Sequence, residues 1–162
     1  FRERWMRDLT VLLRGMGRDE IEAMADWVFD NELWPERRED VMAELRAARA
    51  DGARIVVASG TYTPIAERFA SRLGAEAIGT ELAYDTEGRA TGRFAGTIGT
   101  RDEKVARLTA LLDGAQLEAA YGDTAADIPM LSLAETAIAV HPDTELERIA
   151  RERGWRIIGV EE

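Results

Sequence analysis

Apolar and polar positions follow a helical period over the first third of the chain. In residues 1–33 apolar side chains recur every three or four positions, as in Ile21, Met24 and Val28, which predicts two amphipathic helices in succession. Residues 35–50 continue the pattern and predict a third helix. The aromatic residues of this region are expected either to pack the helices together or to line a substrate pocket; they are Phe1, Trp5, Trp27, Phe29 and Trp34.

The pattern changes after residue 50, where short apolar runs alternate with further helical segments. We expect strands near residues 54–58, 76–79, 117–121, 136–140 and 155–159. This alternation predicts an α/β fold, with a three-layer, Rossmann-like parallel sheet covered by helices. Residues 84–95 instead predict a β-hairpin insertion around Asp85-Thr86-Glu87-Gly88. We divide the chain into a partial helical cap, residues 1–34, and an α/β core, residues 35–162.

The loop after the third expected strand carries two carboxylates four positions apart. Leu117–Tyr121 predicts a buried strand, and Gly122 permits a turn after it. Asp123 then lies at the carboxyl end of the strand, and Asp127 lies in the first turn of the next helix. Ligands of open α/β sheets bind at this edge, so the pair is a candidate site for a divalent cation. Alternatively, both aspartates only cap the helix and complement its dipole.

Lys104 is the single lysine among 21 basic residues, and the other twenty are arginine. Thr100-Arg101-Asp102-Glu103 matches a Thr-x-x-Glu capping box, so Lys104 stands in the first turn of a helix. The helix dipole disfavours a cation there. A nearby anion, such as a carboxylate or a phosphoryl oxygen, would explain a compact ammonium at this position. A solvated surface lysine is the alternative.

An apolar, β-branched run over residues 54–58 stops at Ser59-Gly60-Thr61 and enters a helix at Thr63-Pro64. Proline suits the first helical position behind an N-cap at Thr63. The hydroxyl of Ser59, with the backbone N–H groups of Gly60 and Thr61, forms a candidate binding site for one anionic oxygen. A plain serine turn without a ligand is the alternative.

Three features follow one another along the chain: the Ser59 turn, Lys104 and the loop of Asp123 and Asp127. In this order they resemble the haloacid dehalogenase superfamily of phosphohydrolases. The branch they resemble is that of phosphoserine phosphatase. The likeness extends from Leu33 onward. Its other segments are Ile78-Gly79-Thr80-Glu81, Gly88-Arg89-Ala90-Thr91-Gly92, Glu103-Lys104-Val105 and Ala139-Val140-His141-Pro142-Asp143.

The resemblance implies a role for each matched position. In the family an aspartate attacks the phosphoryl group and forms an aspartyl-phosphate, which water then hydrolyses. The Ser59–Thr61 turn would bind the phosphoryl oxygens, and Lys104 would neutralise the nucleophile and the transferring group. Asp123 would bind Mg²⁺ directly, and Asp127 would act through the metal's waters or by orienting its neighbours.

The nucleophile implied by the resemblance has no counterpart in the sequence. In the family it lies in an Asp-x-Asp motif on an earlier strand, and the 162 residues contain no such motif. Asp8 precedes Leu9-Thr10-Val11, but the pattern around it is helical. We therefore expect an N-terminally truncated protein, inactive by itself, whose missing N-terminal segment carries the nucleophile strand.

Composition limits the partners. A net charge of −10 argues against nucleic acid, which selects basic surfaces. It does not exclude a small phosphorylated substrate, because one lysine and one metal can dominate a pocket. No apolar run reaches membrane-spanning length, so no membrane partner is expected. The chain contains no cysteine, which excludes disulfides and thiol catalysis and fits a cytoplasmic protein.

The expected function is that of a Mg²⁺-dependent phosphomonoester hydrolase. Phosphoserine phosphatases usually read Gly-Asp-Gly-x-Asn-Asp in the metal loop, whereas Thr124 and Ala126 replace that glycine and asparagine here. Ala126 offers no side-chain hydrogen bond, which disfavours phosphoserine as the substrate. The alternatives are a non-catalytic phosphate-binding or regulatory remnant of the same fold and a structural module without a ligand. His141, the only histidine, is expected to be a loop residue.

Overall fold

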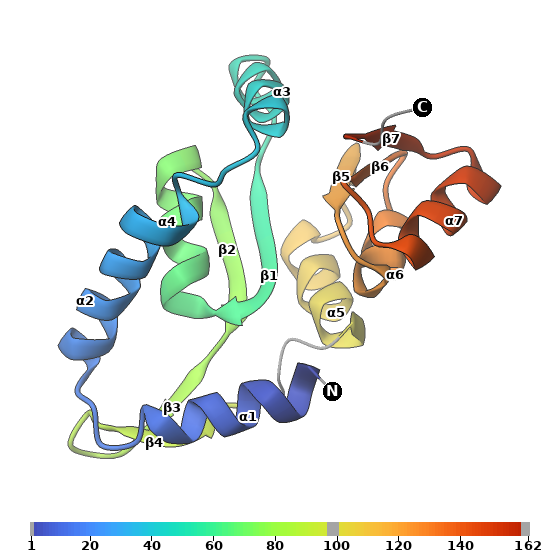
Figure 1. The fold of residues 1–162 in the computed structure, drawn as a ribbon. Coiled ribbons are helices and arrows are strands. Elements are labelled where there is room, and N and C mark those ends of the chain that lie inside the picture. Colours follow the sequence, from blue (N-terminus) through green and yellow to red (C-terminus); the bar gives the residue numbers. More distant parts are fainter. Residues whose placement is uncertain (1, 97–100, 160–162) are drawn as a thin grey trace. The chain divides into compact units, whose positions relative to one another are not determined.

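The computed structural model describes residues 2–96 and 101–159 (Figure 1). The chain divides into two compact units, unit 1 (Phe1–Thr100) and unit 2 (Arg101–Glu162). Unit 1 contains α1 (Arg2–Leu12), α2 (Arg18–Val28), the π-helical turn η1 (Phe29–Leu33), α3 (Glu39–Ala50), β1 (Val56–Tyr62), α4 (Thr63–Leu73), β2 (Glu76–Thr80), β3 (Leu82–Tyr84) and β4 (Ala90–Phe94). Unit 2 contains α5 (Arg101–Leu112), β5 (Ala119–Gly122), the 3-10 turn η2 (Ala125–Asp127), α6 (Ile128–Leu131), β6 (Thr136–Val140), α7 (Thr144–Arg153) and β7 (Arg156–Ile158).

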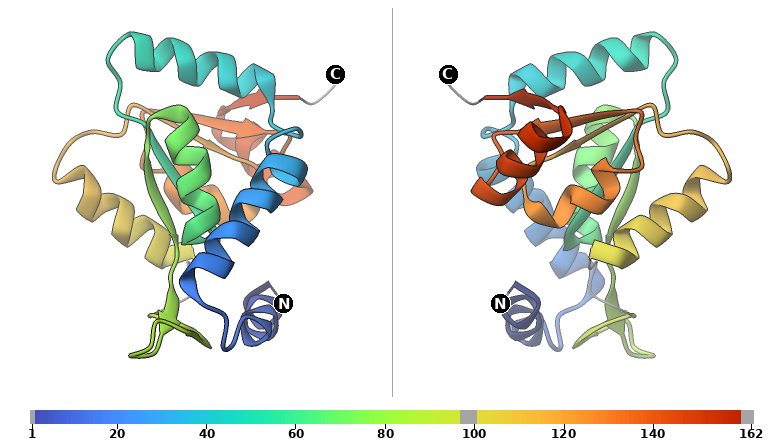
Figure 2. Two further views of the ribbon diagram at one scale, coloured as in Figure 1. Left: turned by 90° about the vertical axis from the view of Figure 1, so that its left-hand side faces the viewer. Right: turned by 90° about the vertical axis from the view of Figure 1, so that its right-hand side faces the viewer.

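In unit 1, β1, α4 and β2 form a parallel βαβ unit. β1 and β2 pair in parallel, with Val57 opposite Ala77, and α4 follows β1 directly and packs on both strands (Figure 1, Figure 2). Gly79 of β2 permits this close packing, because a Cβ there would lie 2.6 Å from the Cα of Thr63. The N-terminus of α4 is therefore fixed at the carboxyl end of β1.

Aromatic side chains join α4 to the segment that follows α2. The rings of Phe29 and Phe69 meet edge to face at 4.9 Å, and Trp34 packs on Phe29 at 5.4 Å. Phe29 and Trp34 therefore pack elements together, which is the first of the two alternatives given for the aromatic residues. The remaining ones are Trp5 and Trp27, which are more than half exposed, and Phe1, which lies outside the described residues.

The expected hairpin is formed by β3 and β4, and α1 packs along β4. Ile21 of α2 and Leu82 of β3 belong to a buried cluster beneath it. Tyr62, the last residue of β1, links these parts. Its ring stacks on Phe94 of β4 at 6.3 Å, and its hydroxyl shares a hydrogen bond of 3.0 Å with the buried hydroxyl of Thr10 in α1. The carboxyl end of β1 is thus held by contacts with β4 and with α1.

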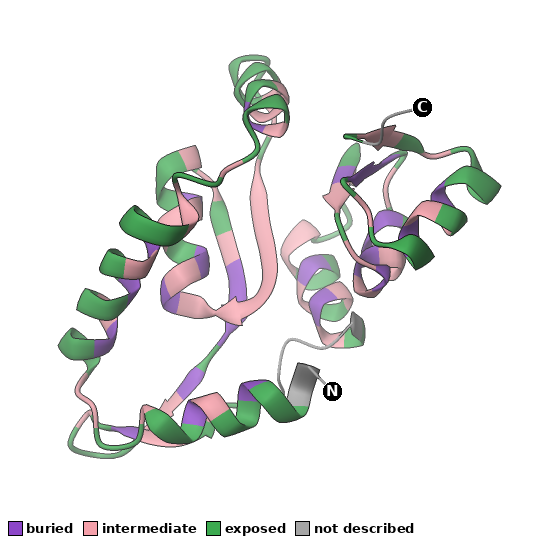
Figure 3. Ribbon diagram, in the orientation of Figure 1, coloured by how far each residue is buried: buried purple, intermediate pink, exposed green. Residues whose placement is uncertain are grey.

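Unit 2 is built on a three-stranded parallel sheet in the order β5, β6, β7. The central strand is buried over residues 137–140 (Figure 3). Leu131 of α6 and Leu146 of α7 are both 0% exposed and complete the core beside it. α7 begins behind an N-cap at Asp143 and is followed by Gly154 as its C-cap, whose φ of 67° suits a residue without a Cβ.

The α/β class with parallel strands is confirmed, and several element boundaries differ from expectation. β1 continues to Tyr62 rather than ending at residue 58, because pairing resumes at Tyr62 and Thr80 after a shift in register. The N-cap of α4 is accordingly Tyr62 and not Thr63. The third helix begins at Glu39 rather than at residue 35, after an extended Arg38.

Other expectations stay predictions. The parallel strands of the described residues form one sheet in each unit, and no pairing between β1 and β5 is seen among them. The capping box expected at Thr100 lies outside the described residues. The boundary between cap and core expected at residue 34 is not tested by the division into units. Of the helices described, none has the length and apolar content needed to span a membrane.

Candidate metal centre and phosphate site

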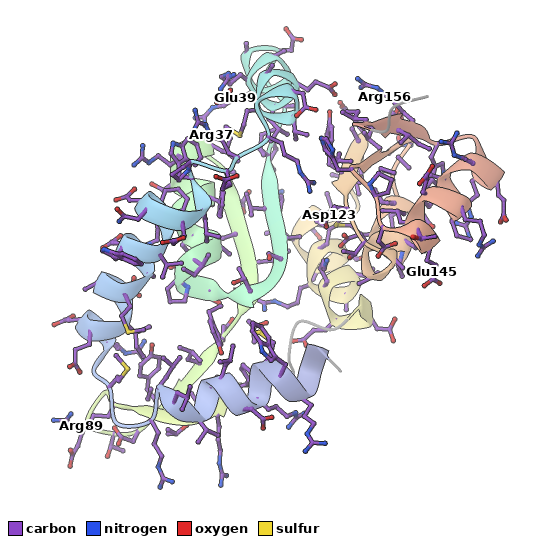
Figure 4. The ribbon with its side chains drawn as sticks, in the orientation of Figure 1. Arg37, Glu39, Arg89, Asp123, Glu145 and Arg156 are labelled. Atoms are coloured by element: carbon purple, nitrogen blue, oxygen red, sulfur yellow. The ribbon has the colours of Figure 1, made fainter. Side chains whose placement is uncertain are left out.

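Asp123 lies directly after β5 (Figure 4). The strand ends at Gly122, which pairs with Ala139 of β6, and Asp123 is exposed to solvent. The residues that follow form the single turn η2, which leads into α6. The Asp123 carboxylate is therefore carried on the carboxyl edge of a parallel sheet, the edge at which α/β proteins bind ligands.

Lys104 and Asp127 form a buried ion pair. The ammonium of Lys104 donates to Oδ1 of Asp127 at 2.5 Å, and the two side chains are 9% and 10% exposed. The anion expected beside Lys104 is thus the Asp127 carboxylate, and Lys104 is not a solvated surface residue. Removing one partner of such a pair leaves an uncompensated buried charge, which costs about 3–5 kcal/mol of stability.

The other oxygen of Asp127 organises the loop around Asp123. Oδ2 accepts hydrogen bonds from the backbone N–H of Asp123 at 3.2 Å and of Thr124 at 3.3 Å, and from the Thr124 hydroxyl at 3.3 Å. Burial by itself raises the pKa of Asp127. The charge and hydrogen bond of Lys104, with the two backbone donors, outweigh burial and hold this pKa below its ordinary value of 3.8. Asp127 is therefore ionised at neutral pH.

A glycine is needed at position 122, the end of β5, because the neighbouring Asp127 leaves no room for a Cβ. A Cβ at this position would lie 2.6 Å from Cβ of Asp127 and 3.1 Å from its Cγ. The φ of Gly122 is not positive, so the freedom to turn, which the sequence suggested, is not its role. The absent side chain instead lets Asp127 pack against the strand backbone.

The oxygen donors of the loop suit Mg²⁺, which takes hard oxygen ligands and keeps several waters. Asp123 supplies an exposed carboxylate. Both oxygens of Asp127 already accept hydrogen bonds, which favours an orienting role over direct ligation. Within residues 2–96 and 101–159 no group of three or more His, Cys, Asp or Glu gathers to hold a metal. A full coordination shell therefore needs water and oxygen ligands beyond these side chains.

Ser59, Gly60 and Thr61 lie in unit 1 inside β1, and not in a turn after it as expected, because the strand runs on to Tyr62. This three-residue segment near the carboxyl end of β1 is called the Ser59 turn below. Oγ of Ser59 accepts the N–H of Thr61 at 3.2 Å. The carbonyl of Gly60 accepts the hydroxyl of Thr80 at 2.9 Å, and Thr80 is 0% exposed. The register shift between Ala58 and Tyr62 takes the turn out of the regular ladder, just before α4 begins. The N–H of Thr61 is thus already bonded to Ser59, so it would have to exchange this acceptor to bind an anionic oxygen.

The described contacts bring Lys104, Asp127 and the Asp123 loop together in unit 2, and the Ser59–Thr61 turn lies in unit 1. Sequence reasoning missed Asp143, whose Oδ2 accepts the N–H of Ala125 at 2.9 Å. An aspartate before a helical segment is an N-cap signal, so the sequence could have identified Asp143 as a helix cap. Its contact with the loop of Asp123 has no such local signal. His141 lies in a loop, as expected, with a φ of 42°.

Comparison with known proteins identifies the family. The profile of the haloacid dehalogenase-like hydrolases matches residues 1–132. Phosphoserine phosphatase SerB1 of Mycobacterium tuberculosis is 34% identical over 160 residues, which cover 93% of this chain and 50% of that protein. The chain thus spans about half the length of the curated relatives it matches.

Solved structures share the fold. A protein of unknown function from Bordetella pertussis Tohama I superposes with a TM-score of 0.86 at 26% identity, covering 98% of this chain and 74% of that one. A phospho-aspartyl intermediate analogue of phosphoserine phosphatase superposes with a TM-score of 0.65 at 20% identity, covering 99% and 73%. The chain therefore belongs to the haloacid dehalogenase-like hydrolase family, within which it is similar to phosphoserine phosphatase.

Proposed function

We propose that the protein, at its full length, is a Mg²⁺-dependent phosphomonoester hydrolase that acts through an aspartyl-phosphate intermediate. The observation that carries this proposal is the buried pair of Lys104 and Asp127, which organises the loop of Asp123 at the carboxyl end of β5. Phosphoryl transfer depends mainly on positioned charge, and here the ammonium of Lys104 in α5 holds the Asp127 carboxylate, which in turn bonds the backbone N–H of Asp123.

Each candidate residue has a role in this proposal. The hydroxyl of Ser59 and the backbone N–H groups of Gly60 and Thr61 bind the phosphoryl oxygens, with the N–H of Thr61 exchanging its present acceptor, Oγ of Ser59, for the substrate. Lys104 has three N–H donors, of which Asp127 uses one, and its ammonium compensates charge on the nucleophile and the phosphoryl group. Because Asp127 fixes that ammonium beforehand, little reorganisation is needed during the reaction.

Asp123 is the proposed Mg²⁺ ligand, and Asp127 is proposed to orient the loop through its hydrogen bonds. Bound Mg²⁺ supplies positive charge that stabilises the phosphoryl oxygens. The hydrogen bond from Asp123 N–H to Asp127 restrains the backbone that carries the ligand. This restraint supports the assignment of Asp127 to the metal site without direct ligation.

The nucleophile is proposed to lie outside the given sequence. The 162 residues contain no Asp-x-Asp, and the matched relatives are about twice as long as the matched region. We therefore expect the 162-residue chain alone to show no turnover. A small phosphorylated compound is the proposed substrate. Although a relative is named phosphoserine phosphatase, Ala126 cannot supply a side-chain hydrogen bond, so we do not propose phosphoserine itself.

The test is Mg²⁺ binding and phosphatase activity of the full-length protein and its Asp123→Ala variant. We expect Asp123→Ala to remove the calorimetric signal of Mg²⁺ binding and the dependence of activity on Mg²⁺. Glu118→Ala is the matched control, because it removes a carboxylate just before β5, at the opposite end from Asp123. Unchanged Mg²⁺ affinity in Asp123→Ala would show that the metal assignment is wrong.

A non-catalytic phosphate-binding remnant is the second candidate, because the given sequence lacks the nucleophile motif. The two candidates give different outcomes in the same experiment. A full-length protein that binds Mg²⁺ and inorganic phosphate at Asp123 and the Ser59 turn, but hydrolyses no phosphomonoester, would favour the remnant.

A further inference from the structure

Asp143 connects the start of α7 to the loop of the proposed metal site. One carboxylate oxygen, Oδ1, accepts the N–H of Leu146 at 2.8 Å and caps α7. The other, Oδ2, accepts the N–H of Ala125 at 2.9 Å. The backbone N–H of Asp143 donates to the carbonyl of Asp123 at 2.9 Å. Beside the helical hydrogen bond from Glu147 N–H to its carbonyl, Asp143 thus makes one hydrogen bond to α7 and two to the loop of Asp123.

We propose that Asp143 is a positioning residue for the metal site. Its backbone holds the carbonyl of Asp123 and its side chain holds the N–H of Ala125, so the chain is restrained on both sides of Thr124. With the hydrogen bond from Asp123 N–H to Asp127, these contacts fix the direction in which the Asp123 side chain leaves the backbone. Asp143 therefore raises the affinity of the site for Mg²⁺ without touching the metal.

Helix capping alone does not account for this arrangement. A cap needs one oxygen for one backbone N–H of the first turn, and Oδ1 meets that need at Leu146. The second oxygen reaches Ala125, which lies 18 positions away in the sequence on a different element. Ala125 is buried at 9% exposure, and a buried N–H that loses its acceptor is costly.

Two substitutions separate capping from positioning. Asp143→Ser keeps a good N-cap, because serine caps about as well as aspartate, but its single Oγ cannot occupy the positions of both carboxylate oxygens. Asp143→Ala removes both acceptors and serves as the reference for loss of the cap. Both variants are made in the full-length protein and titrated with Mg²⁺ alone, and amide hydrogen exchange is followed at Ala125 and Leu146.

In Asp143→Ser we expect slow exchange at Leu146 to persist and exchange at Ala125 to accelerate. The Mg²⁺ affinity should fall roughly three- to tenfold, the fold-change equivalent to one net hydrogen bond. In phosphatase assays the Mg²⁺ concentration for half-maximal rate should rise by a similar factor, with kcat at saturating Mg²⁺ near that of the unmodified protein. A purely structural role would not give recovery at high Mg²⁺.

The inference rests on the proposed function, and its failure is distinguishable from failure of that proposal. If Asp123→Ala abolishes Mg²⁺ binding while Asp143→Ser leaves the affinity unchanged, the metal site stands and the role of Asp143 is overturned. If neither substitution changes Mg²⁺ binding, the metal site itself is wrong. Equal exchange at Ala125 in Asp143→Ser and the unmodified protein would also overturn the positioning role.

Discussion

Lysine and arginine are not equivalent at position 104. The ammonium of Lys104 is buried and lies 2.5 Å from Asp127, whereas a guanidinium is larger and planar and presents its donors in a fixed fork. The sequence identified Lys104 as unusual and indicated a nearby anion. It did not identify Asp127 as that anion, because the pair joins two elements whose packing cannot be inferred from local patterns.

We predict that Lys104→Met in the full-length protein lowers kcat about a hundredfold, or ~3 kcal/mol, as expected for loss of one preorganised charge. Lys104→Arg should recover little of this loss. Because Lys104→Met also leaves Asp127 unpaired, the double variant Lys104→Met/Asp127→Asn is the stability control, and thermal unfolding is measured for all three. Near-normal rates in Lys104→Met and Lys104→Arg would remove Lys104 from the catalytic role.

The pKa of Asp127 leads to a prediction about acid stability. This pKa lies below its ordinary value of 3.8 in the folded protein, so Asp127 contributes stability that is fully present above the ordinary pKa. That contribution is lost as the pH falls through the lower, folded value. Unfolding by urea at a series of pH values from roughly 5 downward should therefore show a steeper loss of stability in the unmodified protein than in Asp127→Asn. Parallel curves would contradict this prediction.

At the scale of elements, the packing of η2 against the end of β5 depends on the absence of a side chain at Gly122. A Cβ on Gly122 would lie 2.6 Å from Cβ of Asp127. We predict that Gly122→Ala destabilises unit 2 by about 1–3 kcal/mol, the usual cost of overpacking a close contact. It should also displace Asp127 from Lys104. Chemical denaturation measures the loss. Gly17→Ala controls for loss of a glycine alone, because the φ of Gly17 is −71° and a Cβ there would meet only Oε2 of Glu20, at 3.5 Å.

Some elements could be predicted from the sequence because their own residues determine them. The run Thr136–Val140 is apolar and β-branched and forms β6 as expected, and the Asp85–Gly88 turn forms the hairpin between β3 and β4. β1 was expected to end before Ser59, but it extends to Tyr62. That extension depends on pairing with β2 and on the contact of Tyr62 with Thr10. Such long-range contacts leave no local signal.

At the scale of the whole molecule, β1 and β5 are edge strands among the described strands, as are β2 and β7. Among the described strands β1 pairs only with β2, and β5 pairs only with β6. β1 and β5 carry the Ser59 turn and Asp123 at their carboxyl ends. In the family that this chain resembles, the nucleophile strand lies between the corresponding strands. An unpaired strand edge leaves backbone N–H and C=O groups without partners, which is unfavourable when buried and favours aggregation when exposed.

We therefore predict that, in the full-length protein, a strand from outside the given sequence pairs with both β1 and β5. Alternate amides of Val56–Ala58 and of Ala119 and Ala120 should exchange with solvent roughly tenfold more slowly, or slower still, in the full-length protein than in the 162-residue chain. Ile138 is the internal control, because β6 pairs with β5 and β7 on its two sides and should be protected in both proteins. If β1 and β5 already exchange as slowly as Ile138 in the 162-residue chain, their edges are paired without an added strand. The nucleophile would then have to reach the site by another route, and the proposed mechanism would lose its structural basis.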